Sequence, residues 1–345
     1  MSKSIISALL LTFFFILALP VGVIADDSKA TIGGYGELHF SMSKSGNNKT
    51  VKRIEFHRFY LFLDYQFSKK WSVKTEVGVD QRSDFYTSHD DKHLNLVKAV
   101  IDYRGSQYFG FQVGVVQPSM GLLNDKHEPQ MFLSVERPNY SENILFGPRY
   151  NNGAAIYGNA GGFDYKLTVM EGLKTYHRSY SYGNEVTQLP YFDSLFYNLR
   201  VDYTAIPGLL AGASVSFTKQ KMVNMEIKDL SYTIAEIHAK YEANNVYAVF
   251  ELGSTKISDN NYRKAFGYYF DLGYNIGHLF HTKAVIYPWI HYANCNPSDQ
   301  KIREDYRFTE KTIGLTVKPI PNIVFKMEYG KNLSNYFSMG AGYTF

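Results

Sequence analysis

Few residues have the type and spacing that metal or enzyme chemistry requires. His89 and His93 are four residues apart, with the carboxylates Asp90 and Asp91 between them. On a helix this spacing could bind zinc. The surrounding sequence predicts an exposed loop instead, so a solvated loop is the favoured interpretation.

The other motifs of this kind are incomplete. Residues 127–128 form a His-Glu pair without the second histidine of a metalloprotease, and residues 33–36 lack the third glycine of a dinucleotide-binding turn. Asp229, Ser231 and His238 could be arranged as a hydrolase triad, but nothing in their spacing requires it. We therefore expect no enzyme activity, no cofactor and no metal site.

Composition narrows the class of protein further. The 345 residues include 29 Tyr and 25 Phe, aromatic residues make up 16%, and the mean hydropathy is −0.25. Beyond the first two dozen residues no run of 18 apolar residues occurs, which excludes a bundle of transmembrane helices. The single cysteine, Cys295, excludes intrachain disulfides. The net charge of +4 gives no indication of a nucleic-acid partner.

The first 25 residues have the pattern of an export signal. A positively charged start precedes an apolar stretch over residues 5–19, and Val23 and Ala25 are small or aliphatic residues at the expected cleavage site. A membrane anchor is the alternative, but the apolar run is short and no stop-transfer charges follow. The prediction is a signal peptide over residues 1–25 and one barrel domain over residues 26–345.

The rest of the chain reads as a series of β-strands. In residues 31–43, for example, Leu38 and Phe40 alternate with Glu37 and His39, and this period of two is typical of a strand with one apolar and one polar face. Sixteen such tracts are predicted, at 31–43, 58–67, 71–82, 94–104, 108–119, 149–159, 162–171, 193–204, 208–220, 231–242, 244–256, 264–276, 279–293, 304–318, 322–331 and 335–345.

The connections between these strands alternate in length. Links such as 68–70 and 105–107 are short, whereas 83–93 and 120–148 are long. An outer-membrane barrel has this pattern, because its periplasmic turns are short and its external loops are long. Backbone amides in hydrocarbon must all be paired, and a sheet achieves this only by closing. We therefore expect an all-β fold, a transmembrane antiparallel barrel of about 16 strands; a secreted Greek-key protein is the alternative.

A barrel of sixteen strands leaves an aqueous channel, lined by the polar face of each strand. Basic and acidic candidates for this lining are equally numerous, so no single-sign field is predicted. The basic residues are Arg58, Lys74, Arg82, Lys98, Arg104, Lys166, Arg200, Lys240, Lys283, Lys318 and Lys326; the acidic residues are Glu37, Asp64, Glu76, Asp80, Asp102, Asp164, Asp202, Glu236, Glu251, Asp271 and Glu328.

The long connection 120–148 follows the fifth strand, and we expect it to fold into the lumen and narrow it. Its charged residues would place both signs at the constriction: Asp125, Lys126, His127, Glu128, Glu136, Arg137 and Glu142. They could produce a transverse field that orients solutes, or form salt bridges that anchor the loop to the wall. The two interpretations are compatible.

Three segments resemble the phosphate-selective porin O/P-like family. They are Gly33-Gly34-Tyr35-Gly36-Glu37, Phe56-His57-Arg58-Phe59, and the stretch from Gly121-Leu122-Leu123-Asn124 through His127-Glu128-Pro129 to Val135-Glu136-Arg137-Pro138. The resemblance implies a sixteen-stranded, often trimeric channel in the outer membrane of a Gram-negative bacterium, surrounded by lipid. In the family, phosphate selectivity rests on basic residues of the pore.

The sequence leaves three functions open. The first is passive diffusion of small hydrophilic solutes or ions. The second is an anion- or phosphate-selective channel, although each basic lining candidate has an acidic counterpart. The third is a barrel whose external loops, chiefly 83–93, 172–192 and 293–303, bind a ligand or a surface.

Overall fold

The structure is a computed structural model that describes residues 29–44, 49–81, 92–145, 147–173, 176–177, 194–223, 229–258, 264–297 and 307–345. The predicted signal peptide, His89, Arg82 and most of the long external loops lie outside these residues. None of the helical segments in the described ranges is both long and apolar enough to cross a membrane.

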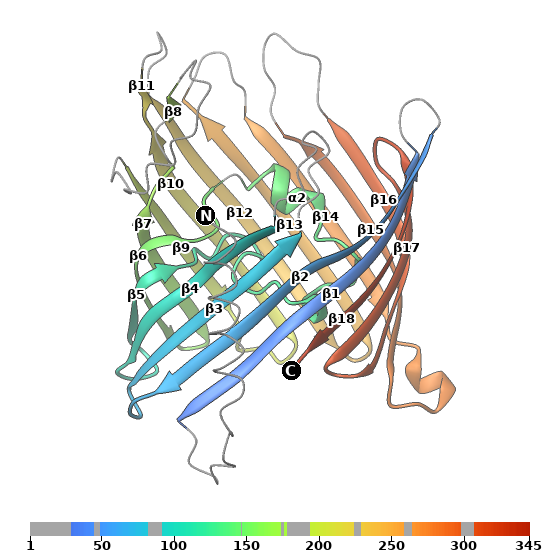
Figure 1. Ribbon diagram of the computed structural model, residues 1–345, viewed down its shortest axis with the longest axis horizontal. Helices are drawn as coiled ribbons and strands as arrows, with labels where there is room; N and C mark the ends of the chain where they lie inside the picture. The colour runs from blue at the N-terminus through green and yellow to red at the C-terminus, as the bar shows by residue number, and fades with distance from the viewer. Residues whose placement is uncertain are drawn as a thin grey trace, which may run out of the picture.

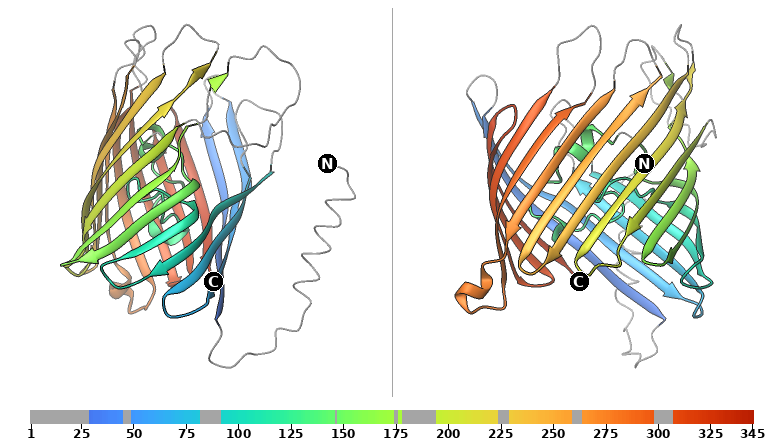
Figure 2. Two further views of the ribbon diagram at one scale, coloured as in Figure 1. Left: turned by 90° about the vertical axis from the view of Figure 1, so that its left-hand side faces the viewer. Right: turned by 180° about the vertical axis from the view of Figure 1, so that it is seen from behind.

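Sixteen antiparallel strands close into one barrel, in which β1 pairs with both β2 and β18 (Figures 1 and 2). This confirms the predicted fold class and strand number. The strands are β1 (Ala30–Lys44), β2 (Thr50–Gln66), β3 (Trp71–Gln81), β4 (Lys92–Arg104), β5 (Gly110–Val116), β6 (Asn151–Ala160), β7 (Phe163–Glu171), β9 (Leu195–Tyr203), β10 (Leu209–Gln220), β12 (Leu230–Ala243), β13 (Val246–Ile257), β14 (Ala265–Tyr274), β15 (Val285–Asn296), β16 (Phe308–Ile320), β17 (Ile323–Lys331) and β18 (Asn335–Thr344). Two short strands, β8 (Tyr176–His177) and β11 (Met222–Val223), form a separate parallel pair.

At one end of the barrel, tight turns join neighbouring strands. β12 and β13 are joined by Asn244 and Asn245, both at positive φ (52° and 65°), and β6 and β7 by Gly161 and Gly162 (60° and 84°). Two-residue turns of this kind require positive φ at both positions, which Asn and Gly tolerate. The short links of the sequence are therefore hairpin turns.

Burial alternates along several strands, most clearly along β9, β12, β14 and β17. In β17 the exposed residues Phe325, Met327 and Tyr329 alternate with the buried residues Lys326 and Glu328. The outer surface is apolar, as a surface in contact with lipid requires.

The inner face is not uniformly polar, contrary to expectation. Tyr247, Tyr269, Tyr287 and Trp289, on β13 to β15, belong to one buried apolar cluster with residues of the chain between β5 and β6. This part of the wall therefore packs against protein rather than lining water.

The predicted strand 279–293 begins too early. The described chain forms a helical turn, η2 (Gly277–Phe280), and β15 starts only at Val285. The side chain of Asn275 organises this longer turn, because its Oδ1 accepts hydrogen bonds from the amides of Gly277 and Ile286, both at 3.0 Å. The prediction that Lys283 lines the pore is wrong, since it is exposed in this turn. Cys295, which lies beyond the end of the predicted strand 279–293, is buried in β15.

A β-bulge interrupts the pairing of β1 with β2. Glu37 is opposite Arg58 and Leu38 is opposite Phe56, so His57 is an extra residue without a partner. Arg58 is buried on the inner face, whereas Phe56 is exposed outside. A bulge redirects side chains locally, and here it brings His57 to the inner side, where it lies near Glu136.

Candidate functional site: the segment inside the barrel

The chain leaves the wall after β5 and returns to it at β6. Between them, residues 117–145 and 147–150, here called the inner segment, lie within the ring of strands (Figure 1). The segment contains a helical turn, η1 (Pro129–Met131), and one short helix, α2 (Asn139–Asn143). Side chains from strands around the barrel hold it.

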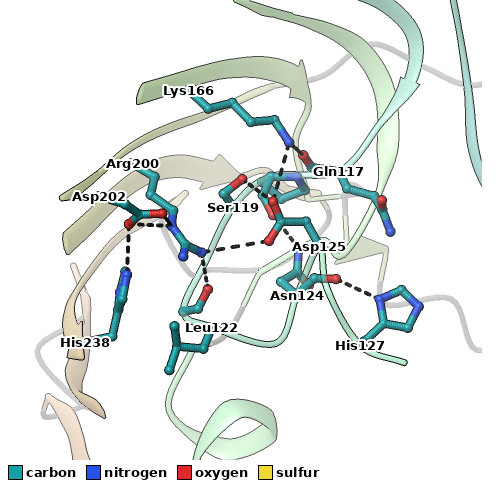
Figure 3. Close-up of polar contacts among 12 residues, drawn as sticks. Gln117, Ser119, Leu122, Asn124, Asp125, His127, Lys166, Arg200, Asp202 and His238 are labelled. Atoms are coloured by element: carbon teal, nitrogen blue, oxygen red, sulfur yellow. Dashed lines mark hydrogen bonds and ion pairs between the residues drawn. The ribbon is translucent and has the colours of Figure 1, made fainter. Parts of the chain in front are cut away.

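The first anchor is Asp125 (Figure 3). Its Oδ2 accepts a 2.7 Å hydrogen bond from Ser119, and Lys166 of β7 and Arg200 of β9 each lie 3.8 Å from the carboxylate. Burial alone would raise the pKa of Asp125, but these two cations, aided by the Ser119 hydroxyl, hold the pKa below its usual range. Three predicted site residues thus meet, and they do so as a partly buried ion-pair cluster.

The second anchor is a row of carboxylates that accept backbone amides. The amide of Gly121 donates to Glu236 Oε1 at 3.3 Å, and that of Leu122 donates to Glu251. His238 bridges Glu236 and Asp202, at 2.9 Å to each (Figure 3 shows the Asp202 contact). Buried amides need such partners. His238 thus positions the carboxylates of Glu236 and Asp202 in this anchor.

The third anchor is apolar. Phe132, Leu133 and Tyr140 of the inner segment pack with Tyr269 and Trp289 of the wall in the main buried cluster. Burying each large apolar side chain stabilises the contact by about 1.5–3 kcal/mol. This anchor contains no charged residues, and the sequence did not predict it.

Polar contacts with β16 and β17 continue the same anchor. Thr316 Oγ1 donates to the carbonyl of Leu133 at 2.6 Å, and Lys326 Nζ donates to the carbonyl of Ser134 at 2.7 Å. Three predicted lining residues on this side therefore bind the inner segment directly: Lys318, Lys326 and Glu328.

Residues of β1 to β3 hold the opposite side of the segment. His127 Nε2 lies 3.3 Å from Glu76, and the His127 ring packs edge-on against Tyr35 and Tyr60. On the same side, Glu136 contacts His39, with Nδ1 and Oε1 2.7 Å apart. His39 was not among the predicted site residues, although it shares a strand face with Glu37 in the alternation.

Among the described residues, several other predicted lining residues make no contact with the inner segment, or only one. Lys74 pairs with Asp102 at 3.1 Å, and Glu37 is hydrogen-bonded by Arg58. Lys240 reaches the segment only through the carbonyl of Met131, at 3.4 Å. Of the other wall candidates, Asp64 and Lys98 are half-buried and Arg104 is exposed at the end of β4. Within the inner segment itself, Lys126 is exposed and Glu128 is half-buried.

Arg137 takes part in none of the anchoring contacts described above. In the described part of the chain, no hydrogen bond or ion pair involves its guanidinium group. Burial, together with the nearby positive charges of Arg58 and Arg149, lowers the pKa of Arg137 to about 10. Glu142 pairs with Arg149 at 2.6 Å, with both side chains partly exposed. Arg137 therefore contributes a positive charge that no direct contact between described residues compensates, whereas the nearby Arg58 and Arg149 are paired with carboxylates.

Comparisons with known proteins support the architecture. No protein-family profile matches the chain. A protein of Aquifex aeolicus (strain VF5), described as uncharacterized, is 25% identical over 329 residues, which cover 87% of this chain and 74% of that protein.

Solved structures share the fold. The anion-selective porin from Comamonas acidovorans aligns with a TM-score of 0.66 at 13% identity, covering 92% of this chain and 100% of the porin. OmpT of Vibrio cholerae in its trimer form aligns with a TM-score of 0.62 at 12% identity, covering 92% and 100%. At these identities the likeness shows only that the chain has the fold of outer-membrane porins. It does not confirm the phosphate-selective family that the sequence resembles.

Proposed function

We propose that this protein is a passive outer-membrane channel for small hydrophilic solutes or ions. The observation that carries the proposal is a closed sixteen-strand barrel, apolar outside and charged inside, with one segment held across its interior. Sixteen strands enclose a water-filled space that side chains alone do not fill. The inner segment would then set the free cross-section.

The chemistry of passage follows from the charges that face the remaining space. Lys126 is exposed, and the Glu142–Arg149 pair is partly exposed, so a passing solute would meet both signs near the inner segment. Charged groups at a constriction screen ions by sign. No bound cofactor and no chemical step are required.

The proposed location is the outer membrane of a Gram-negative bacterium, reached after removal of residues 1–25. The apolar outer face would contact lipid, and a homotrimer is proposed because OmpT, which has the same fold, is known in a trimer form. Gel mobility of the unheated protein, with and without cross-linking, tests the trimer. A single band at the monomer position in both would exclude it.

Planar-bilayer recording tests channel function. The purified, refolded chain should insert and produce discrete conductance steps that scale with salt concentration. Liposomes containing it should swell in small sugars more quickly than in large ones. A correctly folded barrel that gives no ion-permeable state would defeat the proposal.

A second candidate, anion or phosphate selectivity, is favoured by one observation. Arg137 lies near Arg58 and Arg149, and no described residue neutralises its charge by a direct contact. An anion could be attracted to such a site. The reversal potential in a salt gradient decides: an anion-directed potential supports the candidate, and a zero or cation-directed potential excludes it.

A further inference from the structure

Two histidines from neighbouring strands converge on one glutamate of the inner segment. His39 Nδ1 lies 2.7 Å from Glu136 Oε1, and His57 Nε2 lies 3.6 Å from Glu136 Oε2. The two imidazole rings stack, with centroids 4.5 Å apart and planes 16° from parallel. One potential ligand atom from each of His39, His57, Glu136 and Glu55 lies within 4.8 Å of the others.

The bulge in β2 creates this arrangement. Strict alternation would send His57 to the outer face, because its neighbour Arg58 points inside. The extra residue in the register allows His57 and Arg58 to lie on the same side. The bulge thus adds a second imidazole to the inner wall, opposite His39 of β1.

The second nitrogen of each ring is also held by a carboxylate. His39 Nε2 lies 3.1 Å from Glu37 Oε2, and His57 Nδ1 lies 3.1 Å from Glu55 Oε1. Glu37 is itself hydrogen-bonded by Arg58. In metal sites, the ring nitrogen that does not bind the metal commonly donates to a carboxylate, which fixes the tautomer and the orientation of the ring. Both rings here have that environment.

We propose that His39, His57 and Glu136 bind one divalent first-row transition metal ion, such as Zn²⁺, while Glu37 and Glu55 orient the two imidazoles. Imidazole nitrogen and carboxylate oxygen bind Zn²⁺ at about 2.0–2.2 Å, which places tetrahedral ligands about 3.4 Å apart. The observed separations of 2.7 and 3.6 Å lie on either side of this value.

The ion can reach the site from the lumen, since the Glu136 side chain is 52% exposed. Water would complete the coordination. A bound ion would link the inner segment to β1 and β2 more firmly than hydrogen bonds do, and it would displace the protons on the ring nitrogens that face Glu136. The other group of this kind, Glu236, His238 and Glu251, is fully buried and already accepts backbone amides of the inner segment.

Metal titration of the untagged, full-length chain in detergent tests the proposal. After treatment with a chelator, the wild type should bind one equivalent of Zn²⁺, and Co²⁺ should give the visible absorption of a site with nitrogen and oxygen ligands. His57→Gln and Glu136→Gln should each weaken Zn²⁺ binding at least tenfold, and Glu55→Gln by about 10–100-fold. The matched control is His278→Gln, in the η2 turn, which should bind as the wild type does.

Two results would overturn the proposal. The first is a wild type that binds no Zn²⁺ below about 1 mM. The second is unchanged affinity in both His57→Gln and Glu136→Gln, which would assign the ion to other groups, such as His89 and His93. Folding of each variant is checked by heat-dependent gel mobility. Glu136→Gln decides the matter if His57→Gln does not fold, because Glu136 lies outside the strands. The readout is independent of conductance.

Discussion

The backbone amide of Val135 donates a 2.7 Å hydrogen bond to Oε2 of Glu328, a residue 193 positions further along the chain. Both groups are buried inside the barrel. On the same strand, Lys326 donates a hydrogen bond to the carbonyl of Ser134, so β17 binds two successive residues of the inner segment. Hydrogen bonds of this kind would hold the inner segment in one position within the lumen.

Replacing Glu328 tests the importance of its hydrogen bond with the Val135 amide. Glu328→Ala leaves the buried Val135 amide without an acceptor, at a cost of about 1–3 kcal/mol. The inner segment should then fluctuate, with noisier single-channel currents and faster proteolysis within residues 117–150. Glu328→Gln retains a carbonyl acceptor and should resemble the wild type. Identical currents and cleavage rates for Glu328→Ala and the wild type would contradict this role.

The apolar anchor makes a separate prediction. Leu133 is fully buried against the wall, so Leu133→Ala should destabilise the docked segment by about 2–5 kcal/mol. The sixteen-strand ladder is unaffected, so heat-dependent gel mobility should persist while mean conductance rises. Leu272→Ala, on the exposed outer face, is the matched control and should leave conductance unchanged. Equal conductance in all three proteins would refute the prediction.

Local pattern predicted the barrel, because the alternation along each strand reflects its own two faces. It misplaced Lys283, because the side chain of Asn275, two residues before η2 begins, organises a turn. The apolar residues Leu279 and Phe280 give this turn the sequence pattern of a strand. It also gave no signal for the inward position of His57, because a bulge adds a residue to the count.

The sequence predicted which residues belong to the site better than it predicted which of them contact one another. Asp125 and Arg200 were both candidates, but their pairing joins residues that no local period relates. The aromatic part of the wall around Trp289 was not predicted for a related reason. An apolar residue on the inner face breaks the alternation, and the inner segment that covers it comes from a distant part of the sequence.

A pH dependence follows from Asp125. Its pKa is lower when the inner segment is docked than when the carboxyl is free, where it is about 3.9. The charged form therefore stabilises docking above about pH 4, and this contribution is lost as the pH falls through the lowered pKa. The difference between wild type and Asp125→Asn in proteolysis of the segment should be largest at neutral pH.

The same difference should shrink as the pH falls below about 4, because the wild-type carboxyl then becomes neutral like the amide. The comparison isolates one carboxyl, since all other acidic groups are common to both proteins. A difference that is independent of pH would show that the charge of Asp125 does not hold the segment.

Removing the charge of Arg137 should alter ion preference. Arg137→Gln eliminates a positive charge that has no direct partner among the described residues, so the reversal potential in a salt gradient should move in the cation direction. Arg104→Gln, at the exposed end of β4, removes an equal charge away from the inner segment and should cause a smaller movement. A larger effect of Arg104→Gln would place the selective charge at the barrel end.

Single-channel conductance, compared between the wild type and a variant in which residues 121–145 are replaced by a short Gly-Ser link, tests the central account most directly. An open lumen narrowed by a docked segment predicts discrete steps for the wild type and clearly larger steps for the shortened chain, with both proteins folded by gel mobility. Steps of equal size, or a folded wild type that conducts no ions, would contradict it.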